Sequence, residues 1–294
     1  QQLADKLANS PESPEKSLIR HALLEFHLGG IDLPDLQQAR LREIREEMTQ
    51  LQAAFEQNLL DSMAAWQYHT NDAAALKGLP DSTMEAAKQA AIADDKQGWL
   101  LGLDQPNYMA VMTYAEDPAL REFFYKGWCT RASSQGPLGS KFDNTENMER
   151  ILRLRQEVAK LVGYSNYAEY ALASRMASSV EEVSNFLHEL ADVSAPAAKR
   201  ELAELESYAG RSLHPWDMAY YSEQLRLERF SISDEELRPY FPLNSVLKGF
   251  FGLIENLYGL TLRPESNVDV WHNDADFYSL RNRDGKLVGG VFVD

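Results

Sequence analysis

The stretch DLPDLQQARLREIREEMTQLQAAFEQNLLDSMAAW at residues 32–66 decides the fold class of this chain. Asp32-Leu33-Pro34 is a typical helix start, because proline fits the first turn of a helix. Apolar residues then recur at steps of three and four, which places them on one helix face and is typical of core packing. These residues are Leu41, Ile44, Met48, Leu51 and Phe55. The pattern predicts a helix that runs to about Trp66 and serves as a structural spine.

Helical patterns also fill most of the remaining sequence. Capping and stop signals predict further helices at residues 14–28, 84–93, 119–130, 145–162, 180–193, 215–229 and 245–258. Pro196 predicts a kink or a new helix start, and the helix after it ends at Gly210. A short helix is predicted to start at residues 233–237.

Strand patterns are concentrated near the C-terminal end. Residues 99–103 look extended, and so do residues 268–271 and 277–280. Asn282-Arg283-Asp284-Gly285 is a turn signal, and residues 287–293 read as a strand. The sequence therefore predicts a mainly α, multi-helical lobe with a short β-hairpin or small sheet at its C-terminal end.

Composition narrows the function classes. The 294 residues carry a net charge of −16, which disfavours nucleic acids and anionic membranes as partners because like charges repel. The acidic residues either form a solvated surface or line a cavity that attracts cationic peptide ends. The sequence has no apolar run long enough for a transmembrane helix and no signal peptide. The single cysteine, Cys129, excludes an intrachain disulfide, favours the cytoplasm and is expected to be a buried small hydrophobe.

Helical zinc peptidases carry His-Glu-x-x-His, which places two imidazoles one turn apart. None of the six histidines completes this motif; they are His21, His27, His69, His188, His214 and His272. His188 and Asp192 share a helix face, but the sequence places no third ligand beside them. We therefore expect a surface or capping histidine there, and we assign no catalytic and no metal-binding residue.

Three other groups of residues carry side chains or backbone suited to binding or catalysis. His272, Asp274 and Asp276 would share a face if they lay in a strand and could then hold a cation, although a polar face beside a turn is the favoured interpretation. In residues 214–221, Asp217 is expected to cap a helix and Trp216 to anchor packing, and Tyr220 and Tyr221 are expected to be structural rather than oxyanion donors. Gly289 and Gly290 lie in the predicted terminal strand, where glycine permits close backbone approach, as a peptide that adds to a sheet edge would need.

Many segments, in the same order, resemble the family of zinc metallopeptidases that includes oligopeptidase A and thimet oligopeptidase. The most specific are PWDMAYYSE at residues 215–223 and ISDEELRPYFP at residues 232–242. Shorter resemblances occur at FEQNLLD (55–61), LKGLP (76–80), LLGLD (100–104), MTY (112–114), RASSQGP (131–137) and VDVWH (268–272). One departure is Gly102, where relatives tend to carry a hydroxyl residue.

The resemblance implies a helical fold of two lobes around a channel that admits short peptides. It implies zinc-dependent hydrolysis of oligopeptides in the cytoplasm, including signal-peptide remnants, with ligands in a His-Glu-x-x-His motif downstream of the last strand. We therefore expect residues 1–118 to be a helical N-terminal region and residues 119–294 to begin the catalytic unit. Because the chain starts at Gln1 and stops in mid-strand at Asp294, we expect an excised, inactive part of a longer protein.

The same resemblance implies a role for the terminal strand. Gly289, Gly290, Val291 and Phe292 are expected to touch peptide substrate in the intact enzyme, where zinc is the cofactor; no zinc is expected on this piece. Self-association through apolar surface near this strand is a further expectation. The alternative from another class is a non-catalytic helical scaffold that binds peptides or a protein partner.

Overall fold

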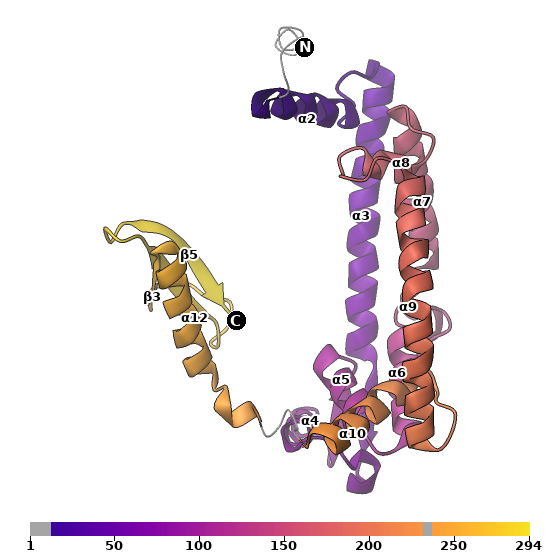
Figure 1. The fold of residues 1–294 in the computed structure, drawn as a ribbon, viewed down its shortest axis with the longest axis vertical. Coiled ribbons are helices and arrows are strands. Elements are labelled where there is room, and N and C mark those ends of the chain that lie inside the picture. Colours follow the sequence, from indigo (N-terminus) through magenta and orange to yellow (C-terminus); the bar gives the residue numbers. More distant parts are fainter. Residues whose placement is uncertain (1–12, 232–236) are drawn as a thin grey trace. The chain divides into compact units, whose positions relative to one another are not determined.

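The computed structural model describes residues 13–231 and 237–294 of the chain (Figure 1). It divides into two compact units, residues 1–225 and residues 226–294. Helices make up most of it, and a three-stranded antiparallel sheet lies in the second unit. The predicted fold class is therefore confirmed. The short helix predicted to start at residues 233–237 falls on residues 232–236, which lie outside the described residues.

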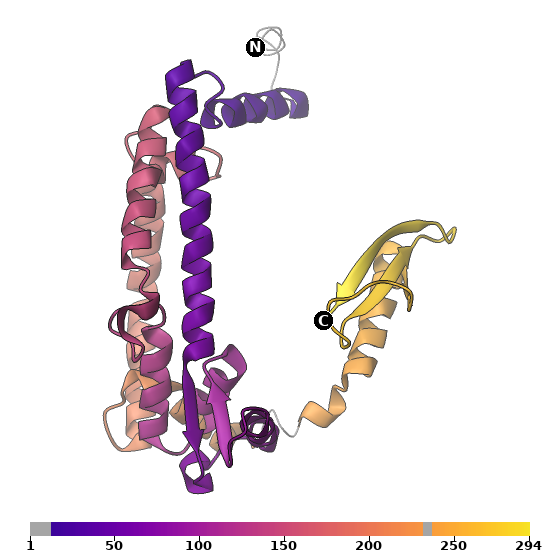
Figure 2. The same ribbon diagram turned by 180° about the vertical axis from the view of Figure 1, so that it is seen from behind.

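Two long helices form the spine of the first unit. Helix α3 (Asp35–Ala65) begins after Pro34, as the sequence predicts, and lies side by side with α7 (Thr145–Leu161) (Figures 1 and 2). Their seam is one apolar cluster made of Leu41, Ile44, Leu154, Val158 and Val162. An ion pair from Arg40 to Glu157, 2.7 Å long, flanks this seam. The apolar stripe of the sequence is thus the core contact of α3.

Helix α2 (Pro14–Leu28) is capped by the Ser13 side chain and is attached to the spine by His27. The Nε2 atom of His27 lies 3.1 Å from the carbonyl oxygen of Val162 at the end of α7. Its Nδ1 atom lies 2.7 Å from a carboxylate oxygen of Asp32. Through these two contacts His27 links the end of α2 to the end of α7 and to the loop before α3.

A second core surrounds Trp66, where α3 ends. Strands β1 (Gln67–Thr70) and β2 (Trp99–Gly102) pair there in antiparallel fashion. The helices of this region are α4 (Asp81–Ala93), α5 (Gln105–Tyr114) and α6 (Pro118–Cys129). The short elements η1 (Ala73–Leu76) and η2 (Gly139–Phe142) complete the connections here, whereas α8 (Tyr167–Leu172) lies against α7 at the first cluster. Gly127 of α6 sits against the Trp66 indole, where a Cβ atom would come within 2.7 Å of the ring nitrogen.

Helix α9 (Val180–Ala209) continues through Pro196, so of the two outcomes predicted at this proline, a kink or a new helix start, the new start is wrong. Pro196 removes one backbone hydrogen bond, but the helix around it is largely exposed, and water can satisfy the carbonyl group that loses its donor. The helix ends at Gly210, which has a φ of 67°. The segment η3 (Pro215–Asp217) then leads into α10 (Met218–Phe230).

The second unit contains η4 (Arg238–Tyr240), helix α12 (Leu243–Tyr258) and the sheet. Its strands β3 (Thr261–Pro264), β4 (Asp276–Arg281) and β5 (Leu287–Val293) follow the order β3–β4–β5. Helix α12 covers one sheet face, with the Phe251 and Tyr278 rings 4.9 Å apart. The expectation of extended structure at residues 268–271 is wrong. The strand that precedes β4 and pairs with it is β3, and residues 268–271 lie in the connection between β3 and β4.

No helix in the described residues has the length and apolar character needed to cross a membrane.

Candidate functional site

The predicted substrate-binding residues lie on β5, which is an edge strand. Among the described residues β5 pairs only with β4, so the backbone groups along its other edge have no strand partner. Gly289, Gly290, Val291 and Phe292 are all exposed on this strand. A register shift near Leu280 and Arg281 marks an irregularity opposite the start of β5. An open edge of this kind can accept an extended peptide through main-chain hydrogen bonds.

The two glycines of β5 have different surroundings. A Cβ atom at Gly290 would overlap the Phe277 ring, whereas a Cβ atom at Gly289 would meet nothing within 4 Å. Gly290 is therefore required by the packing of β4 against β5. The sequence predicted that another group comes close to the backbone at the glycine pair. At Gly290 this group is the Phe277 side chain of the same chain.

An aromatic cluster lies beside the same strand. The Phe277 and Phe292 rings are 4.7 Å apart, and the Trp271 ring lies 5.1 Å from Phe292. The Trp271 indole donates a hydrogen bond of 2.9 Å to the Asp294 carboxylate. Trp271 is nevertheless 63% exposed and Phe292 44% exposed, so the cluster presents apolar surface next to the open edge.

The residues weighed as cation ligands do not share a strand face. His272 and Asp274 lie in a turn before β4, and only Asp276 belongs to the strand. The backbone amide of Asp274 donates to His272 Nδ1 over 3.3 Å. These residues thus form part of a polar turn that leads into β4. On α9, His188 and Asp192 are both exposed, which agrees with a surface histidine.

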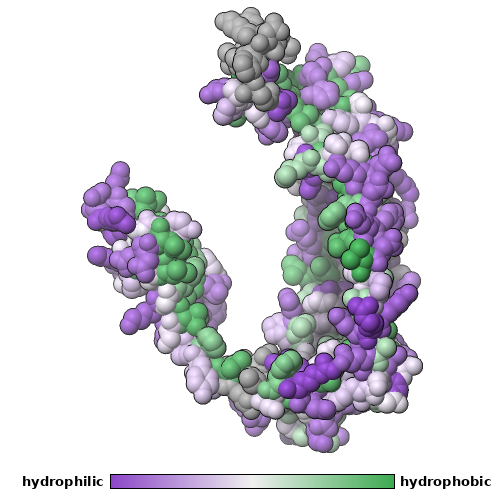
Figure 3. Space-filling view, in the orientation of Figure 1, coloured by the Kyte–Doolittle hydropathy of each residue, from purple (hydrophilic) through white to green (hydrophobic). Residues whose placement is uncertain are grey.

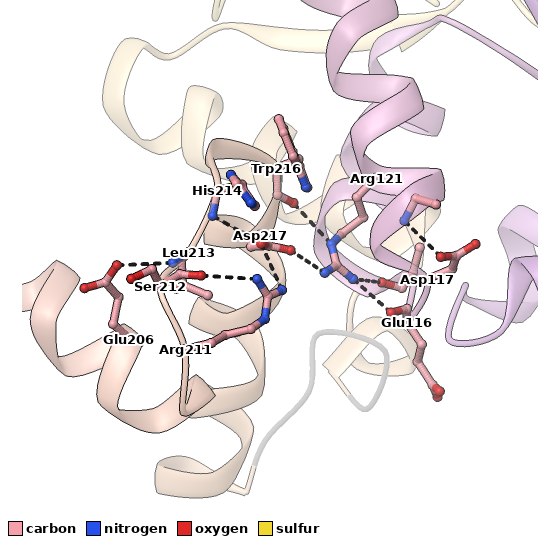
Figure 4. A network of polar contacts seen from close by, with 12 residues as sticks. Glu116, Asp117, Arg121, Glu206, Arg211, Ser212, Leu213, His214, Trp216 and Asp217 are labelled. Atoms are coloured by element: carbon pink, nitrogen blue, oxygen red, sulfur yellow. Dashed lines mark hydrogen bonds and ion pairs between the residues drawn. The ribbon is translucent and has the colours of Figure 1, made fainter.

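Sequence reasoning missed the most buried polar contact in the first unit, which joins α6 to η3 (Figure 4). Asp217 is 0% exposed and Arg121 is 1% exposed, and they form an ion pair of 2.6 Å. Arg211 reaches the second carboxylate oxygen of Asp217 over 2.9 Å. The remaining donors of Arg121 are bonded to backbone carbonyl groups of Ala115, Glu116 and Trp216.

Asp217 also organises its own backbone, as its predicted capping role requires. The His214 amide donates to the Asp217 carboxylate over 3.2 Å, and the Asp217 amide donates to the His214 carbonyl oxygen. Burial alone raises the pKa of the Asp217 carboxyl group. The hydrogen bonds from Arg121, His214 and Arg211 outweigh this effect, so the pKa is lowered below its ordinary value.

The aromatic residues around this network serve packing, as expected. The guanidinium carbon of Arg121 lies 4.3 Å from the centre of the Tyr220 ring. Trp216 stacks on His214, with ring centres 4.6 Å apart. The Tyr220 ring thus packs on an arginine whose donors are already hydrogen-bonded. The segment at residues 214–221 therefore has a structural role, which is to join η3 and α10 to α6.

Cys129 is exposed, so the expectation of a buried small hydrophobe is wrong. It closes α6 on the side opposite to the buried Phe124 and Gly127, which explains its exposure. Its neighbour in the structure is the hydroxyl group of Tyr125, whose pKa is raised by the hydrogen bond to Cys129.

These observations define a mainly helical protein whose small antiparallel sheet has an open edge strand. Residues 111–294 match the sequence profile of Peptidase family M3, and the chain belongs to this family. It is 42% identical to "Oligopeptidase A" of Salmonella typhimurium over 285 residues, 95% of this chain and 42% of that protein. It is 35% identical to "Probable cytosolic oligopeptidase A" of Arabidopsis thaliana over 301 residues, 97% of this chain and 42% of that protein.

A relative with a different printed activity also matches. The chain is 30% identical to "Dipeptidyl carboxypeptidase" of Escherichia coli over 270 residues, 88% of this chain and 39% of that protein. The chain thus spans about two fifths of the length of these curated relatives.

The family implies zinc in the intact enzyme, and catalytic zinc requires three protein ligands and an open position. Within residues 13–231 and 237–294, no group of three His, Cys, Asp or Glu side chains could hold a metal ion. The buried carboxylate of Asp217 is already paired with the guanidinium groups of Arg121 and Arg211, so it is not available as a metal ligand. The described residues therefore do not fit a catalytic zinc, and no chemical step is assigned to them.

Proposed function

We propose that this chain is part of a zinc-dependent oligopeptidase that hydrolyses short peptides, including signal-peptide remnants, in the cytoplasm. The observation that carries the proposal is the 42% identity to oligopeptidase A over 95% of the chain. The cytoplasmic location is supported by the single cysteine and by the printed name of the Arabidopsis thaliana relative.

In this proposal the 294 residues do not hydrolyse peptides by themselves. The sequence contains no His-Glu-x-x-His motif, and the described residues offer no set of three metal ligands. The chain also spans only 42% of the oligopeptidase A sequence. The metal ligands and the general base would lie in polypeptide outside these 294 residues.

The edge of β5 is the proposed place where the chain contributes to substrate binding. A peptide laid along Gly289, Gly290, Val291 and Phe292 would find free backbone donors and acceptors and adjacent aromatic surface. Main-chain hydrogen bonds tolerate many peptide sequences, because they do not depend on side chains. That property suits an enzyme that removes mixed peptide remnants.

The division into residues 1–118 and 119–294 is proposed as the boundary between the helical region and the catalytic unit. The start of the family match at residue 111 supports it. The compact units of the structure divide elsewhere, after residue 225. The two boundaries differ because one describes where the folded chain separates into compact units and the other describes where the family's sequence begins.

The test is the source gene beyond the codon for Asp294, together with the protein that it encodes. We expect His-Glu-x-x-His downstream and hydrolysis of a quenched fluorescent peptide that stops when a chelator removes the metal. Replacing the glutamate of that motif by glutamine should abolish hydrolysis while zinc stays bound. A longer gene product without the motif, or with hydrolysis that is indifferent to chelators, would refute the proposal.

A second candidate function is a non-catalytic helical scaffold that binds peptides or a protein partner. The observation that favours it is the exposed apolar surface on α12, which Figure 3 shows as hydrophobic residues over this helix. The gene test separates the two functions, because a scaffold has no need of the zinc motif.

Exposed apolar side chains near the terminal strand, such as Trp271 and Phe292, together with those on the neighbouring α12, support a proposal of self-association for the 294-residue chain. Sedimentation velocity at a series of concentrations should show a shift from monomer to larger species. A sedimentation coefficient that does not change with concentration would rule this out.

A further inference from the structure

A polar pocket of about 430 Å³ lies in the second unit, between the C-terminal end of α12 and the β3–β4 ladder. Three of its lining residues are arginines: Arg263 on β3, Arg281 on β4 and Arg283 in the turn that follows. All its other lining residues are polar or glycine, and only one of them, Glu255, carries a carboxylate. This pocket is unusual in a chain whose net charge is −16.

The strand register brings two of the arginines to one sheet face. Arg263 pairs with Ser279, and Thr261 pairs with Arg281, so Arg263 and Arg281 are diagonal neighbours on the same side of the β3–β4 ladder. Diagonal positions of this kind are within reach of long side chains, and like charges there repel each other. An anion between the two guanidinium groups would remove this repulsion.

Arg281 is held in place by its own contacts. It donates to the Gly285 carbonyl oxygen over 3.3 Å and to the Glu265 carboxylate over 3.4 Å. Glu265 also accepts a hydrogen bond of 2.7 Å from the Ser279 hydroxyl group, and this bond, followed by that from Arg281, lowers its pKa. Glu265 therefore stays ionised and fixes one arginine of the pocket.

Arg263 lies close enough to Glu265 to help lower the pKa of that carboxyl group, but it does not reach ion-pair distance. Among the described residues, neither Arg263 nor Arg283 forms an ion pair with a carboxylate. Arg283 lies across Gly259, where a Cβ atom would come within 2.7 Å of its Nε atom. The backbone of Gly259 has a φ of 66°, so glycine is favoured there on two grounds. The helix end thus leaves room for the guanidinium group beside the pocket.

We propose that this arginine pocket binds a small oxyanion with two or more negative charges, of phosphate or polycarboxylate type. Guanidinium groups present a fork of donors that matches the oxygens of both ligand types. Asn256, Asn282 and Thr261 add neutral donors to the lining. The pocket volume is that of a small-molecule site. The proposal does not depend on the peptidase function.

Titration calorimetry on the 294-residue protein tests this, with pyrophosphate and citrate as probes at constant ionic strength. We expect one molecule of anion per chain. The double variant Arg263→Ala/Arg283→Ala should bind at least about tenfold more weakly, because it removes two charge-assisted donors. The variant Arg263→Lys/Arg283→Lys keeps the charge but loses the fork, and it should be intermediate.

Lys286→Ala is the control, since it removes one positive charge from the turn that holds Arg283 without lining the pocket. Its affinity should stay within about twofold of the parent chain. Binding of pyrophosphate alone would identify a phosphate ligand, binding of citrate alone a polycarboxylate, and binding of both a general oxyanion site. The absence of binding of either probe would overturn the proposal. So would unchanged binding in the folded double variant, or an equal loss in Lys286→Ala.

Discussion

Helices α7 and α12 both carry apolar residues at steps of three and four, but only α7 has them covered. Ile151, Leu154 and Val158 of α7 are buried. Helix α12 has no buried residue, and its Phe250 and Leu253 are 54% and 53% exposed. The free stripe on α12 consists of Leu243, Val246, Phe250, Leu253 and Leu257.

An apolar stripe therefore specifies a helix face that must be covered, without specifying which element covers it. On α7 the cover is α3, and the contact is a filled core. On α12 one side packs on the sheet through Phe251, while no residue of the second unit buries the other side. A helix that is apolar on both sides is typical of a buried helix.

The largest effect on stability is expected at the buried ion pair between Arg121 and Asp217 in the first unit. Asp217→Ala leaves Arg121 buried without its carboxylate partner, which should lower the free energy of unfolding by about 3–5 kcal/mol. Urea unfolding followed by circular dichroism measures this change. Asp274→Ala is the control, because the Asp274 side chain is 88% exposed, and it should change stability by less than about 0.5 kcal/mol. Similar losses in both variants would contradict the structure.

The pH dependence of this ion pair follows from the lowered pKa of Asp217. Its ordinary value is 3.8, and the folded value lies below it. The stabilisation is therefore present above about pH 4 and is lost as the pH falls through the folded pKa. The stability advantage of the parent chain over Asp217→Asn should shrink below pH 4. An advantage that grows on acidification would show that the sign is wrong.

The seam between α3 and α7 should show the next largest effect. Leu154 is fully buried there, so Leu154→Ala should cost about 2–5 kcal/mol through lost burial and the cavity left behind. The free energy of unfolding in urea is again the measurement. A cost below about 1 kcal/mol would mean that the seam is not packed as described.

The glycines of β5 give a smaller and more local contrast. Gly290→Ala places a methyl group on the Phe277 ring and should destabilise the chain by about 1–3 kcal/mol. Gly289→Ala meets open space and should change stability by less than about 0.5 kcal/mol. Thermal unfolding of the two variants side by side measures the difference. Equal behaviour would contradict the β4–β5 register.

The smallest effect on folding is expected on the uncovered stripe. Leu253→Ala removes an exposed side chain and should alter the free energy of unfolding by less than about 0.5 kcal/mol. The same variant should weaken any self-association seen by sedimentation. A loss comparable with that of Leu154→Ala would show that the α12 stripe is buried in the isolated chain.

Local sequence patterns predicted most of the helices well. Pro34 and Trp66 bound α3, and Gly259 ends α12 in the left-handed conformation, because caps and glycine stops act within a few residues. Strands were less predictable. β1 and β3 are four residues long and are stabilised by partners distant in sequence, so their residues carry little signal of their own.

The edge strand and the buried ion pair differ in the same way. The edge strand with Gly289–Phe292 could be predicted, since its alternation and turn are local. Arg121 shares a helix face with Phe124, three residues later, which hints at burial. Its partner Asp217 lies 96 residues away, so no local pattern could pair them. Pro196 misled because an exposed helix tolerates one missing hydrogen bond.

The most direct test of the whole account is the metal content of the purified 294-residue protein, measured by mass spectrometry after dialysis against zinc. The same sample is assayed with a quenched fluorescent peptide, with and without a chelator. We expect less than stoichiometric zinc and no chelator-sensitive cleavage. One tightly bound zinc per chain, together with cleavage that a chelator abolishes, would contradict it.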